Sequence, residues 1–186
     1  MKIKFNEDGT ILIKDVRLSY PHLFTASAAE EGKPKKFSGS FLLDNTTHAE
    51  EIAALKAKLI ELQKEYFKAK VPAANLFFRN GDDKGKDEYA GTWYCAASET
   101  MRPQVIGKRR EPLAESDDIV YAGCYVNVLI KPWKQDNKHG KKVNANLLAV
   151  QFVRDGERFG QGRPDVSEHF EDEEGDGMSA DDGFDD

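Results

Sequence analysis

The residues best suited to binding chemistry alternate with apolar residues along one stretch, residues 119–131. Its even positions are all apolar, while its odd positions carry rings and polar groups, a series that continues to Trp133. Successive side chains of a β-strand point to opposite faces, so the even set predicts a core face and the odd set an outer face. The odd set includes Tyr121, Tyr125, Asn127, Leu129 and Lys131, and then Trp133.

Exposed rings interleaved with polar groups can stack on nucleobases, because every base has a π-face. The alternative is that Tyr121 and Tyr125 pack beneath a helix or a loop, whereas we expect Trp133 to be exposed. On the strand at 91–98, Trp93 shares a face with Cys95, so Tyr94 points to the other face and is the better stacking candidate.

A lysine-rich segment follows the alternating stretch directly. Residues 131–142 hold five lysines and one acid, a local net charge of +4. Basic side chains near the tip of a hairpin can follow a phosphate backbone, and each neutralised phosphate releases a counterion. We therefore expect Lys131, Lys134 and Lys141 to contact phosphates; a solvated loop that keeps the domain soluble is the alternative. Further candidate contacts are Arg17, Lys36, Arg79 and Arg102, with another basic cluster at 108–110.

Signals for catalysis or metal binding are poor. The four histidines have no metal-ligand spacing to Cys95 or Cys124, and we find no nucleophile motif. Both cysteines lie in apolar runs and are expected to be buried thiols. The sequence predicts a binding protein without cofactor or metal. One enzymatic alternative is a metal-dependent nuclease or resolvase that uses four carboxylates of a Gly-rich loop, Asp82, Asp83, Asp87 and Glu88.

Charge is divided unevenly along the chain. The 186 residues include 27 basic and 33 acidic side chains, a net charge of −6. From Asp165 to the end there are 11 acids and no Lys or Arg, which leaves residues 1–164 at +5 and residues 165–186 at −11. We expect one domain over 1–164 and a disordered acidic tail over 165–186, which cannot bury enough apolar surface to fold. Such asymmetry is typical of nucleic-acid-binding proteins.

The elements that must position these residues are mostly strands. We expect strands at 2–6, 10–20, 37–43, 91–98, 119–131 and 143–153, with a loop over 21–36. Thr47 and Glu50 fit a capping box for one helix, whose apolar stripe comprises Ile52, Leu55, Leu59, Leu62 and Tyr66. The stripe permits a homodimer, but its short length favours packing on the protein's own sheet.

This pattern predicts a mainly β fold with one helix. An OB-fold-like antiparallel barrel fits best, with its helix expected between the third and fourth strands. A membrane span is excluded, because no run of about 18 apolar residues exists.

Three segments resemble a family of phage single-stranded-DNA-binding proteins that was long described as a domain of unknown function. They are Val16–Phe24 (VRLSYPHLF), Tyr121–Val128 (YAGCYVNV) and Leu148–Glu157 (LAVQFVRDGE). The resemblance implies an OB fold and sequence-tolerant binding of single-stranded DNA during phage replication and recombination, in the cytoplasm of the infected bacterium. A strand-annealing recombination mediator is a further alternative.

The end of the tail places one aromatic residue within an acidic cluster: Asp181, Asp182, Phe184, Asp185 and Asp186. We expect it to compete with DNA for the basic surface and to recruit phage replication or recombination proteins; a merely solubilising tail is the alternative. Bacterial proteins of this role end on phenylalanine itself, whereas here Asp185 and Asp186 follow Phe184. That departure favours phage-encoded partners.

Overall fold

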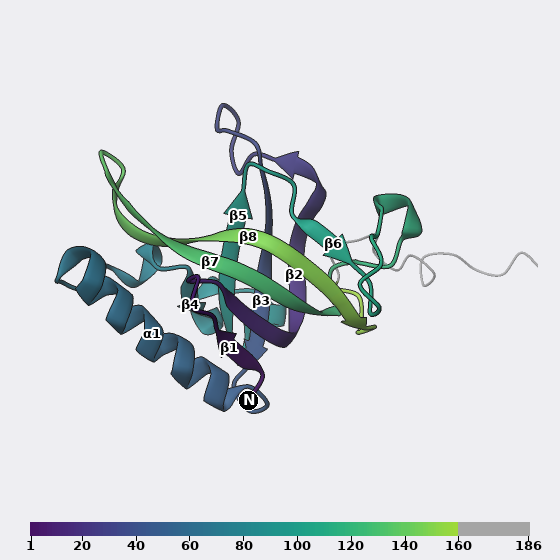
Figure 1. Cartoon of the computed structure of the whole chain (residues 1–186), viewed down its shortest axis with the longest axis horizontal. Helices are drawn as coiled ribbons and strands as arrows, with labels where there is room; N and C mark the ends of the chain where they lie inside the picture. The colour runs from purple at the N-terminus through teal and green to yellow at the C-terminus, as the bar shows by residue number, and fades with distance from the viewer. Residues whose placement is uncertain (160–186) are drawn as a thin grey trace, which may run out of the picture.

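The long strands of the chain close into a barrel (Figure 1). In the computed structural model, which describes residues 1–159, they are β2 (Ile11–Ser27), β3 (Lys36–Asp44), β5 (Thr92–Glu99), β7 (Tyr125–Asn137) and β8 (Gly140–Arg154). They pair in the order β5-β3-β2-β7-β8, and a parallel contact between Ser98 of β5 and Asn146 of β8 closes the ring. This closed five-stranded arrangement confirms the predicted OB-type barrel.

Shorter elements extend or cover the barrel. Strand β1 (Ile3–Phe5) pairs with β2, β4 (Phe78–Asn80) with β5, and β6 (Gln104–Ile106) with β8. Short 3-10 helices lie at Ala73–Asn75, Gly81–Lys84, Asp87–Tyr89 and Glu115–Asp117. The α-helix α1 (Ala49–Phe67) lies between β3 and β4, the third and fourth strands of the chain, as expected. Within the five-stranded barrel it follows the second strand, β3.

The apolar stripe of α1 faces the barrel. Ile52, Leu55, Leu59 and Leu62 are buried in the same core cluster as the inward side chains of the strands. The expectation that the stripe packs on its own sheet is therefore confirmed. The expected Thr47 capping box is wrong: the helix begins after His48, and the backbone N–H groups of Thr46 and Thr47 donate to the Asp44 carboxylate. Asp44 reaches them because β3 ends at this residue.

Alternation in β7 is confirmed by its burial. Val126, Val128 and Ile130 are fully buried, and the odd positions point outward. Cys95 and Cys124 are buried free thiols, as expected, and burial raises the pKa of both. Among the described residues, no helix is both long and apolar enough to cross a membrane.

Two expected boundaries are wrong. Strand β2 continues to Ser27, so much of the expected loop at 21–36 is extended, and register shifts against β3 bend this part of the strand. Strand β7 begins only at Tyr125. The lysine-rich segment is also more ordered than a loop, because residues 131–137 pair with 140–146 as a two-stranded ribbon that projects from the barrel (Figure 1).

Candidate nucleic-acid interface

One row of side chains crosses five strands on the outside of the barrel. Its members are backbone neighbours in the order Tyr125 (β7), Arg17 (β2), Leu42 (β3), Tyr94 (β5) and Arg79 (β4). We call this set the aromatic row. Neighbouring strands lie about 4.8 Å apart, so the row spans about 19 Å. Four of the five residues are candidates from the sequence, and strand pairing brings them together.

Arg17 lies next to Tyr125 in this row and is fixed there. Its Nε donates to the carbonyl of Gly123 at 3.0 Å, and its Nη2 donates to the carbonyl of Glu157. Its guanidinium carbon lies 4.3 Å from the ring centroid of Phe159 and 5.6 Å from that of Tyr125. Arg17 therefore ties the end of the described chain to the aromatic row through a cation–π contact on either side.

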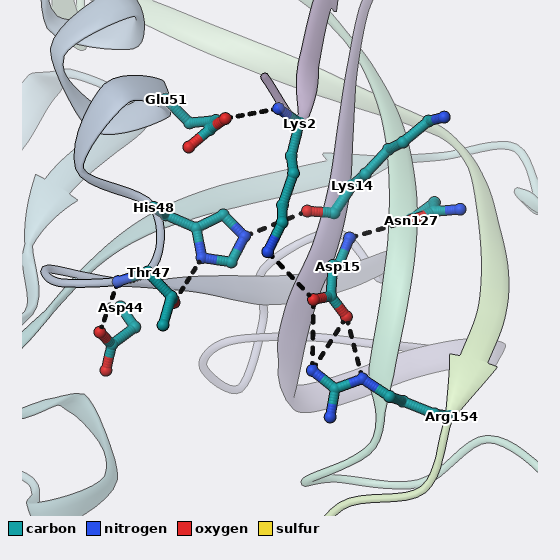
Figure 2. A network of polar contacts seen from close by, with 9 residues as sticks. All are labelled: Lys2, Lys14, Asp15, Asp44, Thr47, His48, Glu51, Asn127 and Arg154. Carbon is teal, nitrogen blue, oxygen red and sulfur yellow. Dashed lines mark hydrogen bonds and ion pairs between the residues drawn. The ribbon is translucent and has the colours of Figure 1, made fainter.

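Tyr125, at the end of the row, is covered by a second arginine. The Arg154 guanidinium carbon lies 3.7 Å from the ring centroid of Tyr125, and Arg154 Nη2 lies 3.1 Å from Asp15 Oδ1. Figure 2 shows Asp15 between Arg154 and Lys2, whose Nζ is 3.4 Å away. Partial burial acts to raise the pKa of Asp15, but the hydrogen bonds and charges of Arg154 and Lys2 outweigh it and hold the pKa below its ordinary value.

The backbone of Asp15 adds to this arrangement. Its φ is 59°, in the left-handed region, and its N–H donates to Asn127 Oδ1 at 2.9 Å. Asp15, Arg17, Tyr125 and Arg154 also line a cavity of about 470 Å³ that continues toward His48. The ion pair in Figure 2 is thus built into one end of the aromatic row.

Tyr94 does not offer an open ring, contrary to the prediction. It is only 5% exposed and packs with Leu42 and Tyr89 in a small cluster on the outside of the barrel. The ring centroids of Tyr89 and Tyr94 are 5.0 Å apart in an edge-to-face arrangement, and the Tyr89 hydroxyl donates to Ser19 Oγ. The physical reason is that the 3-10 helix Asp87–Tyr89, at the end of the Gly-rich loop, carries Tyr89 onto this face.

Tyr121 is held by the chain segment that follows β8. Its hydroxyl is 2.8 Å from Asp155 Oδ1, to which it donates, and it accepts the Gly156 N–H at 3.1 Å. Gly156 has no room for a Cβ, which would lie 2.2 Å from the Gly123 carbonyl oxygen and 2.9 Å from the Tyr125 ring. This close approach lets residues 155–158 lie against both tyrosines. Tyr121 is accordingly half-buried. It packs beneath a loop, which was the alternative to an exposed ring.

A second row, all polar, crosses four of the same strands and β8. His22 pairs with Ser38, Ser38 with Ser98, Ser98 with Asn146, and Asn146 with Lys131. We call this set the polar row. Ser38 is four residues from Leu42 on β3, which puts the two rows about 13 Å apart. On β3 and β5 the side chains between the two rows are small, Ser40 and Ala96, and they pair with each other.

The ribbon of β7 and β8 divides its candidates between two faces. Trp133 is 37% exposed, as expected, and pairs with Asn144 on the face that also carries Lys131. Lys134 and Lys141 lie on the other face, with their Nζ atoms 5.6 and 5.8 Å from the ring centroid of Phe67 at the end of α1. A single strand could not contact Trp133 and both of these lysines on one surface of the ribbon.

Lys36 and Arg102 lie at the far end of the barrel from the aromatic row. Lys36 opens β3 and pairs with Ser27, while the Arg102 guanidinium lies 5.7 Å from the ring centroid of Phe37. Arg79, in contrast, lies 5.5 Å from the ring centroid of Tyr94 at the end of the aromatic row. The basic candidates therefore frame the outer face of the barrel from two sides.

The carboxylates of the alternative metal site do not converge. Asp82 accepts the Gly91 N–H at 2.9 Å, and the described residues contain no group of three or more His, Cys, Asp or Glu side chains that could hold a metal ion. Asp82 and Asp83 belong to one 3-10 helix and Asp87 and Glu88 to the next. The structure therefore does not bring together the four carboxylates that the metal-dependent nuclease alternative requires.

Comparison with known proteins identifies the family. A sequence model of the family described as Enterobacter phage Enc34, ssDNA-binding protein, matches residues 9–182. The chain belongs to this family. It is also 35% identical over 181 residues to putative protein p50 of Acyrthosiphon pisum secondary endosymbiont phage 1, covering 92% of this chain and 94% of that protein.

Solved structures of the family match the barrel closely. The single-stranded DNA-binding protein from bacteriophage Enc34 in complex with ssDNA is 34% identical, with a TM-score of 0.79 over 86% of this chain and 94% of that chain. The bacteriophage T7 single-stranded DNA-binding protein gp2.5 is 13% identical, with a TM-score of 0.52 over 88% of this chain and 96% of that one, and shares the fold alone. The family resemblance read from three segments of the sequence is confirmed.

Several residues of this surface have no obvious signal in the sequence. Tyr89, Arg154, Arg158 and Phe159 complete the aromatic row and its surroundings, yet they lie in segments that read as a polar loop, a strand end and the start of the tail. By contrast, the alternation of residues 37–43 does predict that the small polar side chains of β3 point outward. The tail residues Asp181, Asp182, Phe184, Asp185 and Asp186 lie outside the described residues.

Proposed function

We propose that this protein binds single-stranded DNA across the outer face of its barrel and does so without reading sequence. The observation that carries the proposal is the aromatic row, in which two tyrosines and two arginines lie in line with Leu42 across five strands. A relative of the same family and fold has been solved in complex with ssDNA, which supports the same ligand here.

Rings and cations explain why such binding tolerates any sequence. A base stacks on an aromatic ring or a guanidinium plane through its π-face, and phosphates are neutralised by charge alone. Tyr125 already carries Arg154 over its ring, so a base must either displace that guanidinium or stack on it. Trp133, more exposed than the tyrosines, extends the stacking surface along the ribbon.

The role we infer is the coating and protection of single strands in phage replication and recombination inside the infected bacterium. The acidic tail, with a charge of −11 against +5 for residues 1–164, competes with DNA for the basic surface and recruits replication or recombination partners. The Asp residues after Phe184 favour partners that the phage itself encodes.

A fluorescence titration tests the binding proposal. Adding oligothymidylate should quench tryptophan emission, because Trp133 is exposed on the ribbon. The apparent affinity should fall steeply between about 50 and 200 mM salt as counterion release weakens. Duplex DNA of the same length is the comparison ligand, measured with and without residues 165–186. Binding that ignores salt, or no binding of single strands, would contradict the proposal.

A further inference from the structure

A cavity of about 700 Å³ lies beside the aromatic row, between the loop after β6 and the segment after β8. It shares Tyr121 and Gly156 with the surroundings of Tyr125. Small-molecule sites commonly have volumes of about 300–1,000 Å³, so the cavity is large enough for a ligand with one ring system. The basic cluster at 108–110, singled out in the sequence, contributes two of its lining residues.

Two aromatic rings with a cation near each form its walls. The Arg158 guanidinium lies 4.2 Å from the ring centroid of Tyr121, and the Lys108 Nζ lies 6.0 Å from that of Phe152. Arg109 is the third cation that lines the cavity. A nucleotide needs an aromatic ring on which its base can stack and a cation that can bind its phosphate, and this cavity offers both.

The acids around the cavity are used to build its walls. Glu111 Oε1 accepts the backbone N–H of Arg109 at 2.9 Å, and Asp155 Oδ1 accepts the Tyr121 hydroxyl. Asp118 is the third acid of the lining. Within residues 1–159, neither Lys108, Arg109 nor Arg158 forms an ion pair, so their charges are available to an anionic ligand.

A chain of side-chain amides fixes the loop to the barrel. Gln151 Nε2 donates to the carbonyls of Gly107 and Lys108 at 3.3 and 3.4 Å, and Gln151 Oε1 accepts from Asn127 Nδ2 at 3.0 Å. Asn127 in turn accepts the N–H of Asp15, the residue that holds Arg154 over Tyr125. The cavity and the end of the aromatic row therefore rest on one hydrogen-bonded frame, which favours a preorganised site.

We propose that this cavity binds a nucleoside phosphate, with the base against Tyr121 and Phe152 and the phosphate on Lys108 and Arg109. The nucleotide has two sources. It is either part of a strand that leaves the aromatic row, a source that rests on the proposed function, or a free nucleotide, which does not. The same chemistry recognises both.

The test uses the full chain and the double variant Lys108→Ala/Arg109→Ala. Its matched control is Lys4→Ala/Lys64→Ala, which also removes two positive charges, at exposed positions that do not line the cavity. The probes are oligothymidylates of about 4 and about 16 nucleotides, the range of site sizes for OB folds. Free dTMP and dAMP are titrated calorimetrically.

If the cavity holds a nucleotide of the strand, the double variant should bind the longer oligomer about tenfold more weakly. Its salt slope should shrink by about 0.7, since one phosphate is no longer neutralised. The shorter oligomer and the control variant should be unaffected. If the cavity holds a free nucleotide, only the binding of dTMP or dAMP should be lost.

A double variant that equals its control with every ligand would overturn the cavity proposal while leaving the proposed function intact. A wild-type protein that binds no oligomer would contradict the proposed function. In that case the dTMP and dAMP titrations still decide the cavity: nucleotide binding lost only in the double variant supports it, and none at all overturns it.

Discussion

Rings and cations come in matched pairs on this surface. Arg154 covers Tyr125, Arg158 covers Tyr121, and Arg17 lies against Phe159. Such contacts contribute about 0.5–1 kcal/mol each at exposed sites. A base that stacks on one of these rings therefore displaces a weakly held cation, which costs little free energy. The displaced cation remains close enough to contact a phosphate of the same strand.

Replacing Asp15 with Asn tests the part of this surface drawn in Figure 2. The Asp15 pKa is lowered in the folded protein, so the carboxylate stabilises the fold above its ordinary pKa of 3.8. That contribution is lost as the pH falls through the lowered value. Because the pair is partly exposed, Asp15→Asn should cost only about 0.5–1 kcal/mol at pH 7, or roughly 1–4 °C in Tm.

In strong acid, the thermal unfolding curves of wild type and Asp15→Asn should coincide. If the Tm of Asp15→Asn instead stays below that of wild type by the same amount from pH 7 into strong acid, the charge of Asp15 does not stabilise this part of the fold.

At the scale of elements, the barrel depends on α1 for the closure of its core. Leu55 is fully buried between the helix and the strands, whereas Ile60 on the same helix is 49% exposed. Leu55→Ala should lower the free energy of unfolding by about 2–5 kcal/mol, through lost burial and a residual cavity. Ile60→Ala should change it by less than about 0.5 kcal/mol. Urea unfolding measures both, and equal losses would show that the stripe does not face the barrel.

Local patterns predicted the elements but not their neighbours. The period-two alternation of β7 and the three-four spacing of α1 are properties of consecutive residues, and both are confirmed. The aromatic row depends instead on the register between strands far apart in sequence, such as Arg17 with Leu42 and Tyr125. The alternation of its own strand predicts that Tyr94 is exposed. It is buried because Tyr89, from a different segment, packs against its ring.

At the scale of the whole molecule, charge separates along the chain. The mild net charge of −6 combines a basic part of +5 with a tail of −11. Because the tail is tethered, its effective concentration at the basic surface reaches the millimolar range. Deleting residues 165–186 should therefore tighten oligothymidylate binding, roughly tenfold at about 50 mM salt, and the gain should shrink toward about 200 mM salt as screening increases.

A deletion that weakens DNA binding at low salt would rule out competition by the tail. It would indicate that residues 165–186 support the bound state instead.

The central claim, that DNA crosses the aromatic row, is tested most directly by one comparison of affinities. Tyr125→Leu removes a ring of the row, while Phe5→Leu removes an exposed ring on β1, outside it. Stacking contributes about 1–3 kcal/mol per base, so Tyr125→Leu should weaken oligothymidylate binding by roughly 5- to 150-fold, with Phe5→Leu unchanged from wild type. Equal affinities for Tyr125→Leu and Phe5→Leu would contradict the claim.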